Sequence, residues 1–363
     1  AISQISNSAI SQISKSAISQ ISTFANQQFR NPMKKTHIIL SGGSGSRLWP
    51  LSTKSRTKQY IPIFEGKSLF EMTLQTNQSL CDAVLVVGNI DNYQLSVDAL
   101  TKAGTQNSQV IVEAMPKNTA AAIAFAALAV DEEAILLVTP SDHIIGNQQA
   151  YQQAIEQAFG LAAQGFLVTF GIQPTKPETG YGYIQSKGTD VIAFHEKPTQ
   201  EKAQAFMEAG NYLWNSGIFC FKAKTYLEEL AQFRPDILEA CRKVMQIKKS
   251  DFLDATESSK IPSESIDYAV MEKSKKIKVV HGTFDWSDLG SFEALYEYFS
   301  KKGMYVKDSN LVIAESAHVE LHGLENTMVI QSGASILVMP INQSQEVKKI
   351  YERLAKEGSK LVE

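Results

Sequence analysis

The sequence has few cysteines and no group of residues with metal-binding spacing. Its three cysteines, Cys81, Cys220 and Cys241, are scattered along the chain and match no redox or zinc motif. Its six histidines form no metal motif either. A disulfide framework and a zinc centre are therefore excluded, and thiols of this kind predict a reducing, cytoplasmic location.

The sequence also lacks a membrane-spanning run and a basic block. No apolar stretch approaches the ~20 residues that a helix needs to cross a bilayer. The formal net charge is −3, without a cluster of lysine and arginine, so neither nucleic acid nor membrane is an expected partner. A length of 363 residues with ordinary composition predicts one large globular domain and a small one.

Residues 1–32 differ in character from the rest of the chain. An eight-residue unit rich in Ser, Ile and Gln fills residues 1–8, recurs at 9–16 and returns in degraded form at 17–24. It has neither the charged start nor the continuous apolar core of a signal peptide. The isoleucine spacing leaves a weak amphipathic helix open, but the low complexity favours a poorly ordered extension. We expect the fold to begin near Met33.

The most informative stretch is the apolar run His37–Leu40, followed by a glycine-rich loop and Arg47. The run predicts a buried strand, and the loop is suited to turn backbone N–H groups toward an anion. Two standard phosphate motifs fail here. The Walker pattern requires a glycine where Arg47 stands, and the dinucleotide fingerprint requires one where Leu48 stands. The stretch predicts a phosphate loop of another kind, with Arg47 and Lys58 as its cations.

Strands and helices alternate after this loop, which predicts an α/β fold with a doubly wound, mainly parallel, Rossmann-like sheet. Ligands bind beyond the carboxyl ends of such strands, where the loop would lie. The expected strands are Ile38–Leu40, Ala83–Val87, Val110–Val112, Ala134–Thr139 and Phe166–Gly171, and the expected helices are Leu69–Leu80, Tyr93–Lys102, Thr119–Val130, Gln149–Ala163, Pro235–Ile247 and Ser265–Glu272.

After Lys302 the pattern changes to short strand-like pieces separated by Gly, Asn and Ser. A charged helix is expected to follow at Gln345–Glu357. The expected short strands are Leu311–Ile313, His318–Leu321, Met328–Ile330 and Ser335–Val338.

The stretch Gly42–Ser52, which ends in Leu-Trp-Pro-Leu-Ser, resembles the signature of sugar-nucleotide pyrophosphorylases, as does the later Lys58-Gln59. Its sequence is most similar to that of the mannose-1-phosphate guanylyltransferase (GDP-mannose pyrophosphorylase) branch. One departure is Thr57, since that family usually has proline before the lysine. The resemblance implies a nucleotidyltransferase domain over residues 33–300 and a short β-helix-like tail ending in a helix over residues 301–363. The isomerase domain of longer family members does not fit in this length.

The resemblance also implies a nucleotide site. Besides the loop, it draws on the segment that ends Asn118-Thr119-Ala120 and on the sequence Pro140-Ser141-Asp142-His143. Asn118 is also suited to cap the helix that follows, and one side chain can serve both roles. The implied nucleotide-binding residues are Leu40, Gly42, Gly43, Gly45, Ser46, Asn118, Ala120, Ser141 and Asp142.

Two aspartates are candidate ligands for a divalent cation. Asp142 follows a predicted strand, and Asp288 lies in the sequence Asp-Trp-Ser-Asp-Leu-Gly. Each alone would more often cap a turn or helix. Because both match family motifs, we expect them to share Mg²⁺, which needs few carboxylates when phosphate oxygens and water complete its shell.

A third set of segments resembles the part of the family site that binds the sugar. They are Gly171–Ile172, Pro177–Ile184, His195–Pro198 and Tyr212–Phe219. Carbohydrate recognition needs paired donors and acceptors beside aromatic side chains, and these segments supply both. Lys197 would meet the sugar phosphate. The implied sugar-phosphate-binding residues are Glu178, Gly180, Tyr181, Glu196, Lys197, Asn215 and Gly217.

The resemblance implies the reaction of GTP with α-D-mannose 1-phosphate to give GDP-mannose and pyrophosphate. The sugar phosphate is already anionic, so it needs no general base, and Arg47 and Lys58 would be the catalytic cations. Two alternatives stay open. One is the same chemistry on another sugar phosphate or nucleotide. The other is a silent sugar-nucleotide-binding regulatory subunit, which should have lost these cations or the aspartates. The sequence does not determine the oligomeric state, and a homodimer is left open.

Overall fold

The computed structural model describes residues 33–43 and 45–363. The predicted extension, residues 1–32, lies outside this range. Among the described residues, no helix has both the length and the apolar character that crossing a membrane would require.

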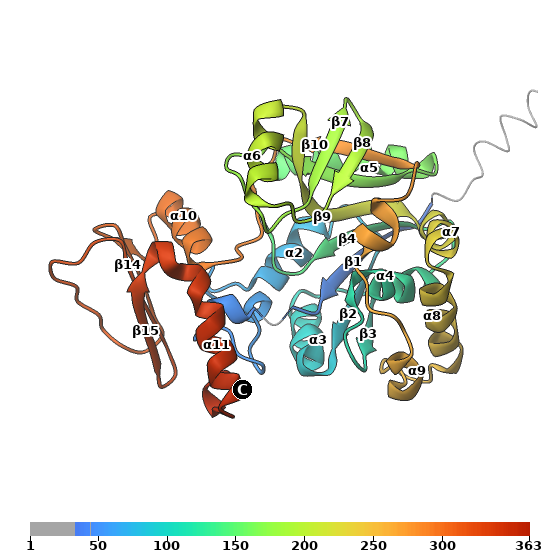
Figure 1. Ribbon diagram of the computed structural model, residues 1–363. Coiled ribbons are helices and arrows are strands. Elements are labelled where there is room, and N and C mark those ends of the chain that lie inside the picture. The colour runs from blue at the N-terminus through green and yellow to red at the C-terminus, as the bar shows by residue number, and fades with distance from the viewer. Residues whose placement is uncertain (1–32, 44) are drawn as a thin grey trace, which may run out of the picture. The chain divides into compact units, whose positions relative to one another are not determined.

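A nine-stranded sheet forms the centre of the fold (Figure 1). In its strand β1, Ile38 and Ile39 point to opposite faces and both are fully buried. Since helices cover both faces, the strand is a continuous apolar run rather than an alternating one. In spatial order the strands are β3 (Ser108–Glu113), β2 (Ala83–Asn89), β1 (Lys35–Ser41), β4 (Ile135–Pro140), β9 (Tyr212–Lys222), β6 (Leu167–Ile172), β10 (Ile277–Gly282), β8 (Asp190–His195) and β7 (Tyr183–Lys187).

The sheet is parallel where the alternation predicts it and antiparallel around β9. Strand β1 runs parallel to β2 and β4, with Ile38 opposite Leu85 and Val138. Strand β9 runs antiparallel to β4, β6 and β7. The α/β class and the Rossmann-like core are confirmed, while the direction of β9 makes the whole sheet mixed. Strand β9 follows the β7–β8 hairpin and helix α6, and it returns alongside β7 in the antiparallel direction.

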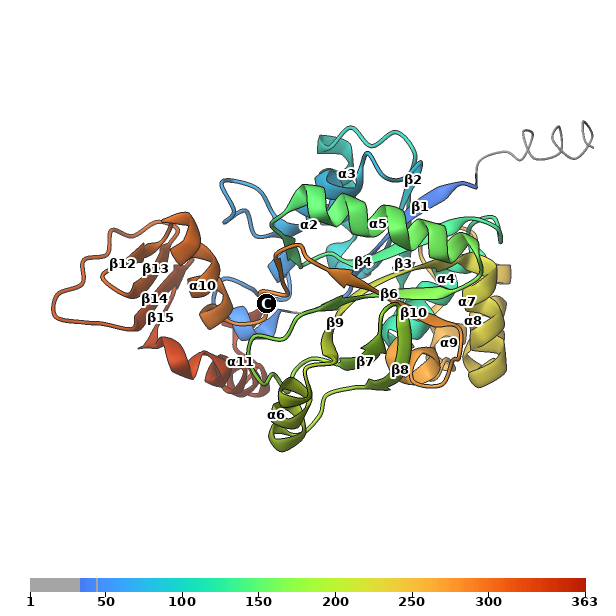
Figure 2. The same ribbon diagram turned by 90° about the horizontal axis from the view of Figure 1, so that it is seen from above.

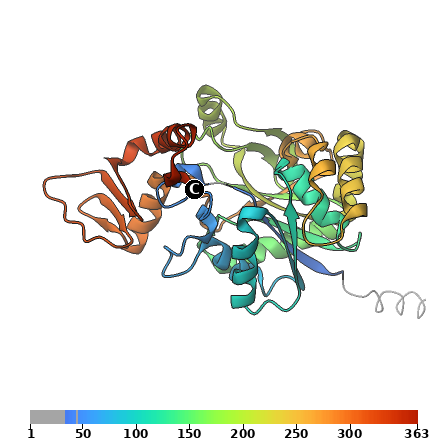
Figure 3. The same ribbon diagram turned by 90° about the horizontal axis from the view of Figure 1, so that it is seen from below.

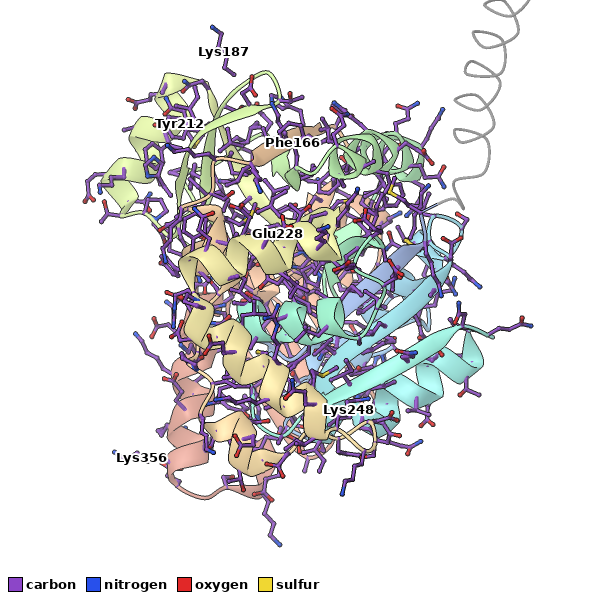
Figure 4. The ribbon with its side chains drawn as sticks, turned by 90° about the vertical axis from the view of Figure 1, so that its right-hand side faces the viewer. Phe166, Lys187, Tyr212, Glu228, Lys248 and Lys356 are labelled. Atoms are coloured by element: carbon purple, nitrogen blue, oxygen red, sulfur yellow. The ribbon has the colours of Figure 1, made fainter. Side chains whose placement is uncertain are left out.

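Two layers of helices enclose the sheet (Figure 2). Helices α4, α7 and α8 share one core cluster with the strands, and α2, α3 and α5 pack on the opposite face. Figure 4 views the face that carries α7, with Glu228, and the end of α8 before Lys248. The helices are α2 (Leu69–Asn77), α3 (Tyr93–Lys102), α4 (Asn118–Leu128), α5 (Gln148–Ala163), α6 (Gln200–Ala209), α7 (Ala223–Phe233), α8 (Pro235–Ile247), α9 (Ala255–Ser259), α10 (Phe292–Lys302) and α11 (Val347–Lys356).

One expected α-helix has a different form. Within Ser265–Glu272 the structure has a short π-helix, η4 (Asp267–Met271). Such π-turns are rare and occur frequently at functional sites. Its last three residues are buried in the core, whereas Asp267 is only half-buried.

The C-terminal strands form a four-stranded mixed sheet, and the expected β-helix-like tail is not confirmed. Its order is β12 (Val306–Lys307), β13 (Asn310–Ala314), β14 (Thr327–Ser332) and β15 (Ser335–Pro340), with only the central pair β13–β14 parallel. The expected strand His318–Leu321 is wrong, because these largely exposed residues lie in the loop between β13 and β14 and pair with no strand of the described chain. The strands pack on α10 and α11 through a shared apolar cluster.

Candidate functional site

The loop after β1 is shaped by Gly45. Its φ is 63°, in the left-handed region that disfavours side chains, and a Cβ there would lie 2.6 Å from Ser52 Oγ and 2.7 Å from Lys58 Cβ. Gly42 and Gly43 are exposed, with open space where a Cβ would point. The loop is thus pressed against Lys58 at one end and open to an incoming ligand at the other.

Lys58 joins two of the predicted motifs. It begins the short helix η2 (Lys58–Tyr60), and the residue is only 6% exposed. Its Nζ donates a 2.9 Å hydrogen bond to Asp142 Oδ2 and a second one to the main-chain oxygen of Asp288. The structure therefore brings together three site residues that are far apart in the sequence.

Arg47 lies in the short helix η1 (Ser46–Leu48), directly after the glycine loop, and its side chain is exposed. Its guanidinium makes no hydrogen bond or ion pair with any residue in the described part of the chain. Arg47 thus offers an uncommitted cation at the loop, whereas the Lys58 cation is already paired.

The charges around Lys58 determine how Asp142 titrates. Burial would raise the pKa of Asp142, but the Lys58 ammonium and then His143 outweigh it, and the pKa lies below its ordinary value. Burial lowers the pKa of His143 even though Asp142 and Asp288 act in the opposite direction. At neutral pH Asp142 is therefore an anion, and the adjacent imidazole is neutral.

Asp288 is held on its other side by Tyr181. The Tyr181 hydroxyl donates to Asp288 Oδ1 at 2.7 Å, and the backbone N–H of Gly290 donates to the same oxygen at 3.1 Å. Burial, and then the charge of Asp288, raise the pKa of Tyr181 well above its ordinary value. The phenol thus stays protonated and serves as a donor. Leu289 has a φ of 45°, a strained value for a non-glycine residue that is characteristic of functional loops.

The two aspartates suit a cation that also needs oxygens from a bound substrate to complete its coordination. No group of three or more His, Cys, Asp and Glu side chains gathers within the described residues, so a metal cage built from protein alone is not present there. Asp142 and Asp288 offer hard carboxylate oxygens. The Asp142 carboxylate already contacts a cation, the Lys58 ammonium, which also contacts the main-chain oxygen of Asp288. This donor set fits Mg²⁺, which is commonly held by one or two carboxylates together with substrate phosphates.

The predicted sugar side, which is the set of residues expected to bind the sugar phosphate, is organised around Asn215. Its Oδ1 accepts hydrogen bonds from Thr169 Oγ1 at 2.9 Å and from the backbone N–H of Gly217 at 3.3 Å. Its Nδ2 donates to Asp267 Oδ1 at 3.0 Å. Both polar atoms of this amide are engaged, which fixes its orientation.

Glu196 and Lys197 lie beside that amide. The Glu196 side chain is 8% exposed and pairs with Lys197 Nζ at 3.2 Å. A Cβ on Gly182 would lie 2.5 Å from Glu196 Oε2 and 3.4 Å from Asn215 Cβ, so a larger residue there would have to displace the Glu196 carboxylate. Lys197 has a φ of 45°, and its side chain is largely exposed.

Aromatic side chains connect the sugar side to the aspartates. The Tyr181 ring meets Trp214 and Trp286 edge-on, with 5.2 Å between centroids in each pair. The Trp286 indole N–H donates to His143 Nδ1 at 3.2 Å. A continuous wall therefore runs from β9 to the motif that contains Asp288.

Several predicted residues have local structural roles. Glu178 Oε1 accepts a hydrogen bond from the backbone N–H of Gly180 at 2.9 Å within its own turn. Ser141 is buried, and its backbone N–H donates to the main-chain oxygen of Leu40 at 3.1 Å. Ala120 is fully buried in α4. These residues shape the backbone of the site.

Asn118 does not cap α4 in the expected way. It is the first residue of the helix, has a φ of 67°, and its Oδ1 accepts from the backbone N–H of Thr119 at 2.8 Å. The contact to the second or third helical N–H that defines an N-cap is not made. Thr119 Oγ1 instead accepts from the backbone N–H of Ile266, which ties the start of α4 to η4.

Sequence reasoning missed Asp267. Burial, and then the charge of Glu196, raise the pKa of Asp267 to about 7. The signal available in the sequence was one acidic residue beside the apolar stretch Ala269–Met271. This stretch was interpreted only as part of a helix. Glu113, at the end of β3, is similar, since burial raises its pKa to about 7.

The chain is similar to known nucleotidyltransferases. A model of the nucleotidyl transferase family matches residues 36–303. The chain is 39% identical over 342 residues to the xanthan biosynthesis protein XanB of Xanthomonas campestris pv. campestris, covering 88% of this chain and 73% of XanB. It is 39% identical over 345 residues to a mannose-1-phosphate guanylyltransferase of Escherichia coli, covering 87% of this chain and 73% of that enzyme.

A solved structure agrees with these relatives. The Thermus thermophilus protein named mannose-1-phosphate geranyltransferase superposes with a TM-score of 0.77 and 32% identity. The match covers 89% of this chain and 100% of that one. The region that matches the family model contains the glycine loop, both aspartates and all the sugar-side segments.

Proposed function

This chain belongs to the nucleotidyl transferase family, among its mannose-1-phosphate guanylyltransferases, and we propose that it transfers a guanylyl group from GTP to α-D-mannose 1-phosphate. The products are GDP-mannose and pyrophosphate. The observation that carries the proposal is the contact of one ammonium, Lys58 Nζ, with the Asp142 carboxylate and with the main-chain oxygen of Asp288. A silent regulatory subunit would have no need to retain that arrangement.

The chain's own residues supply alignment and positive charge. The nucleotide would lie on Gly42, Gly43 and Gly45, with Arg47 and Lys58 against its triphosphate. Because the attacking sugar-phosphate oxygen is already an anion, rate enhancement comes from in-line placement and from neutralising the departing pyrophosphate. Asp142 and Asp288 would hold Mg²⁺, which when bound supplies positive charge to the reacting phosphates.

The remaining residues assigned to the nucleotide and the sugar phosphate frame this centre. For the nucleotide they are Leu40, Ser46, Asn118, Ala120 and Ser141, and for mannose 1-phosphate they are Glu178, Gly180, Tyr181, Glu196, Lys197, Asn215 and Gly217. To the second set we add Asp267, on the basis of its bond to Asn215.

Pyrophosphate release tests the assignment directly. The purified chain would be assayed with GTP, ATP, UTP and CTP, each combined with mannose 1-phosphate and with glucose 1-phosphate. GTP with mannose 1-phosphate should give the highest kcat/KM. A higher value for another pair would assign the chain to a different sugar nucleotide, and no release with any pair would favour a binding protein.

Sugar choice is expected to depend on Asn215. Mannose and glucose differ in the direction of one hydroxyl, and a site whose polar groups lose a partner pays about 1–3 kcal/mol per group. Asn215→Ala should therefore reduce the preference for mannose 1-phosphate over glucose 1-phosphate by about tenfold. The ratio of the two kcat/KM values measures this. An unchanged ratio in the variant would remove Asn215 from sugar recognition.

Affinity for mannose 1-phosphate is expected to weaken as pH rises through the pKa of Asp267, about 7. Below that pH the carboxyl is protonated and can donate, whereas above it two carboxylates, Asp267 and Glu196, face an anionic substrate. KM for the sugar phosphate, measured at saturating GTP across this range, should rise. The Asp267→Asn side chain cannot ionise, so KM should rise less with pH in this variant. The rise that remains reports the ionisation of the substrate's own phosphate. An equal slope in both proteins would show that Asp267 is not the titrating group.

The broader assignments are proposals of the same kind. We take residues 33–300 as the catalytic domain and residues 301–363 as its tail. The parallel register of Leu311 with Met328 supports describing that tail as one β-helix-like turn. The three free cysteines suit a cytoplasmic protein. The homodimer is to be tested by light scattering.

A further inference from the structure

The segment that connects Arg47 to Lys58, residues 48–57, is held from outside by the C-terminal end of the chain. Three donors of this connecting segment reach main-chain oxygens of the last three residues. They are the indole Nε1 of Trp49 to Leu361 at 2.9 Å, the backbone N–H of Lys54 to Val362 at 3.0 Å, and Oγ of Ser55 to Glu363 at 2.9 Å.

Apolar packing supports the same contact. Val362, in the short helix η6 (Lys360–Val362), is 2% exposed although its neighbour Leu361 is 45% exposed. Figures 1 and 3 show α11 (red) beside the blue stretch that contains the connecting segment, and Figure 4 marks its end at Lys356. One cluster contains Leu48, Trp49 and Leu51 of the connecting segment together with Val347, Tyr351 and Val362.

The far end of the connecting segment is anchored as well. Arg56 pairs with Glu315, whose other oxygen accepts a 2.9 Å hydrogen bond from Ser332 Oγ. On the inner side, Thr57 Oγ1 donates to Asn92 Oδ1 at 3.0 Å. The segment is thus fixed between the nucleotide-binding half of the sheet and the C-terminal strands.

A shift of this segment would be transmitted directly to the phosphate site. A Cβ on Gly45 would overlap Ser52 and Lys58, so the loop and the lysine are in close contact. Lys58 Nζ in turn contacts Asp142 and Asp288. A misplacement of about 1 Å at a reacting group can cost about a hundredfold in rate.

We propose that α11 and η6 form a positioning element of the nucleotide site, which acts through the connecting segment to fix Arg47 and Lys58 against the triphosphate. Trp49 and Val362 are its principal positioning residues. The expected change in kcat rests on the proposed function, whereas the contacts themselves do not.

Val362→Asp tests the proposal against a matched control, Leu361→Asp, which adds the same charge to the exposed neighbour. The buried change should lower kcat about tenfold or more, with the Kd for mannose 1-phosphate within about twofold of the unmodified protein. The control should retain normal kcat. In a Lys58→Ala background, Val362→Asp should cause little further loss, because both changes affect one interaction.

Two further measurements keep the outcome decisive. Trp49→Phe retains an aromatic ring but removes the bond to Leu361, and should lower kcat several-fold even if Val362→Asp fails to fold. Hydrogen exchange should be faster at the amides of residues 45–58 in Val362→Asp than in Leu361→Asp. Normal kcat in both Val362→Asp and Trp49→Phe, or unchanged exchange, would overturn the proposal. An inactive unmodified chain would count against the proposed function, while exchange would still test the positioning element.

Discussion

Asp142→Asn and Asp288→Asn are each expected to lower turnover by about a thousandfold or more. The same ammonium contacts the Asp142 carboxylate and the main-chain oxygen of Asp288, so the fold brings these two separate motifs together. Asparagine has nearly the same shape as aspartate but no charge, so it would weaken the hold on a divalent cation worth several kcal/mol to the transition state. Pyrophosphate release at saturating GTP, with Mg²⁺ varied, measures the loss.

The matched control is Asp285→Asn, which lies in the same motif as Asp288 and has an exposed side chain. It should keep near-normal turnover. Circular dichroism and thermal unfolding should show all three variants folded. Full activity in either Asp142→Asn or Asp288→Asn would refute a shared metal site, and recovery of activity at high Mg²⁺ would show that the carboxylate contributes affinity only.

Arg47→Ala is expected to reduce kcat about a hundredfold or more, since removal of one preorganised charge stabiliser typically costs about 10²–10³ in rate. The Arg47 guanidinium is exposed beside the glycine loop and uncommitted among the described residues, so its partner is expected to be the triphosphate. Lys58→Ala should lose at least as much, because Lys58 also links the Asp142 carboxylate to the main-chain oxygen of Asp288.

Steady-state kinetics with GTP varied separate binding from catalysis for these cations. A rise in KM for GTP at constant kcat would show that Arg47 contributes equally to ground state and transition state. Lys54→Ala is the control, because Lys54 lies between the two cations in sequence and its side chain is exposed. It should change neither parameter by more than about twofold.

The local sequence pattern was sufficient to predict the strands of the sheet core. It was insufficient where tertiary contacts determine a strand's direction or partner. The run that contains Ile38 and Ile39 predicts a strand covered on both faces, and this is what the structure has. The antiparallel direction of β9 could not be read from alternation, since it depends on pairing with β4 and β6. The predicted strand at His318–Leu321 failed because short alternating patterns carry no information about whether a partner strand is available.

The site shows the same division. Motif matching identified Lys58, Asp142 and Asp288 separately, but only the fold shows that one ammonium contacts the other two residues. Asp267 was missed because its role depends on Asn215 and Glu196, which come from other elements of the fold.

The cluster that contains Leu51, Phe299, Leu311 and Val347 has a consequence for how the protein unfolds. These residues come from the nucleotide side, α10, the C-terminal sheet and α11, so the tail and the catalytic part share one apolar cluster. Removing the tail would expose a large apolar surface on both pieces. The two parts should therefore melt together, and calorimetry should record one cooperative transition, with equal calorimetric and van't Hoff enthalpies, rather than a separate early melting of the C-terminal strands.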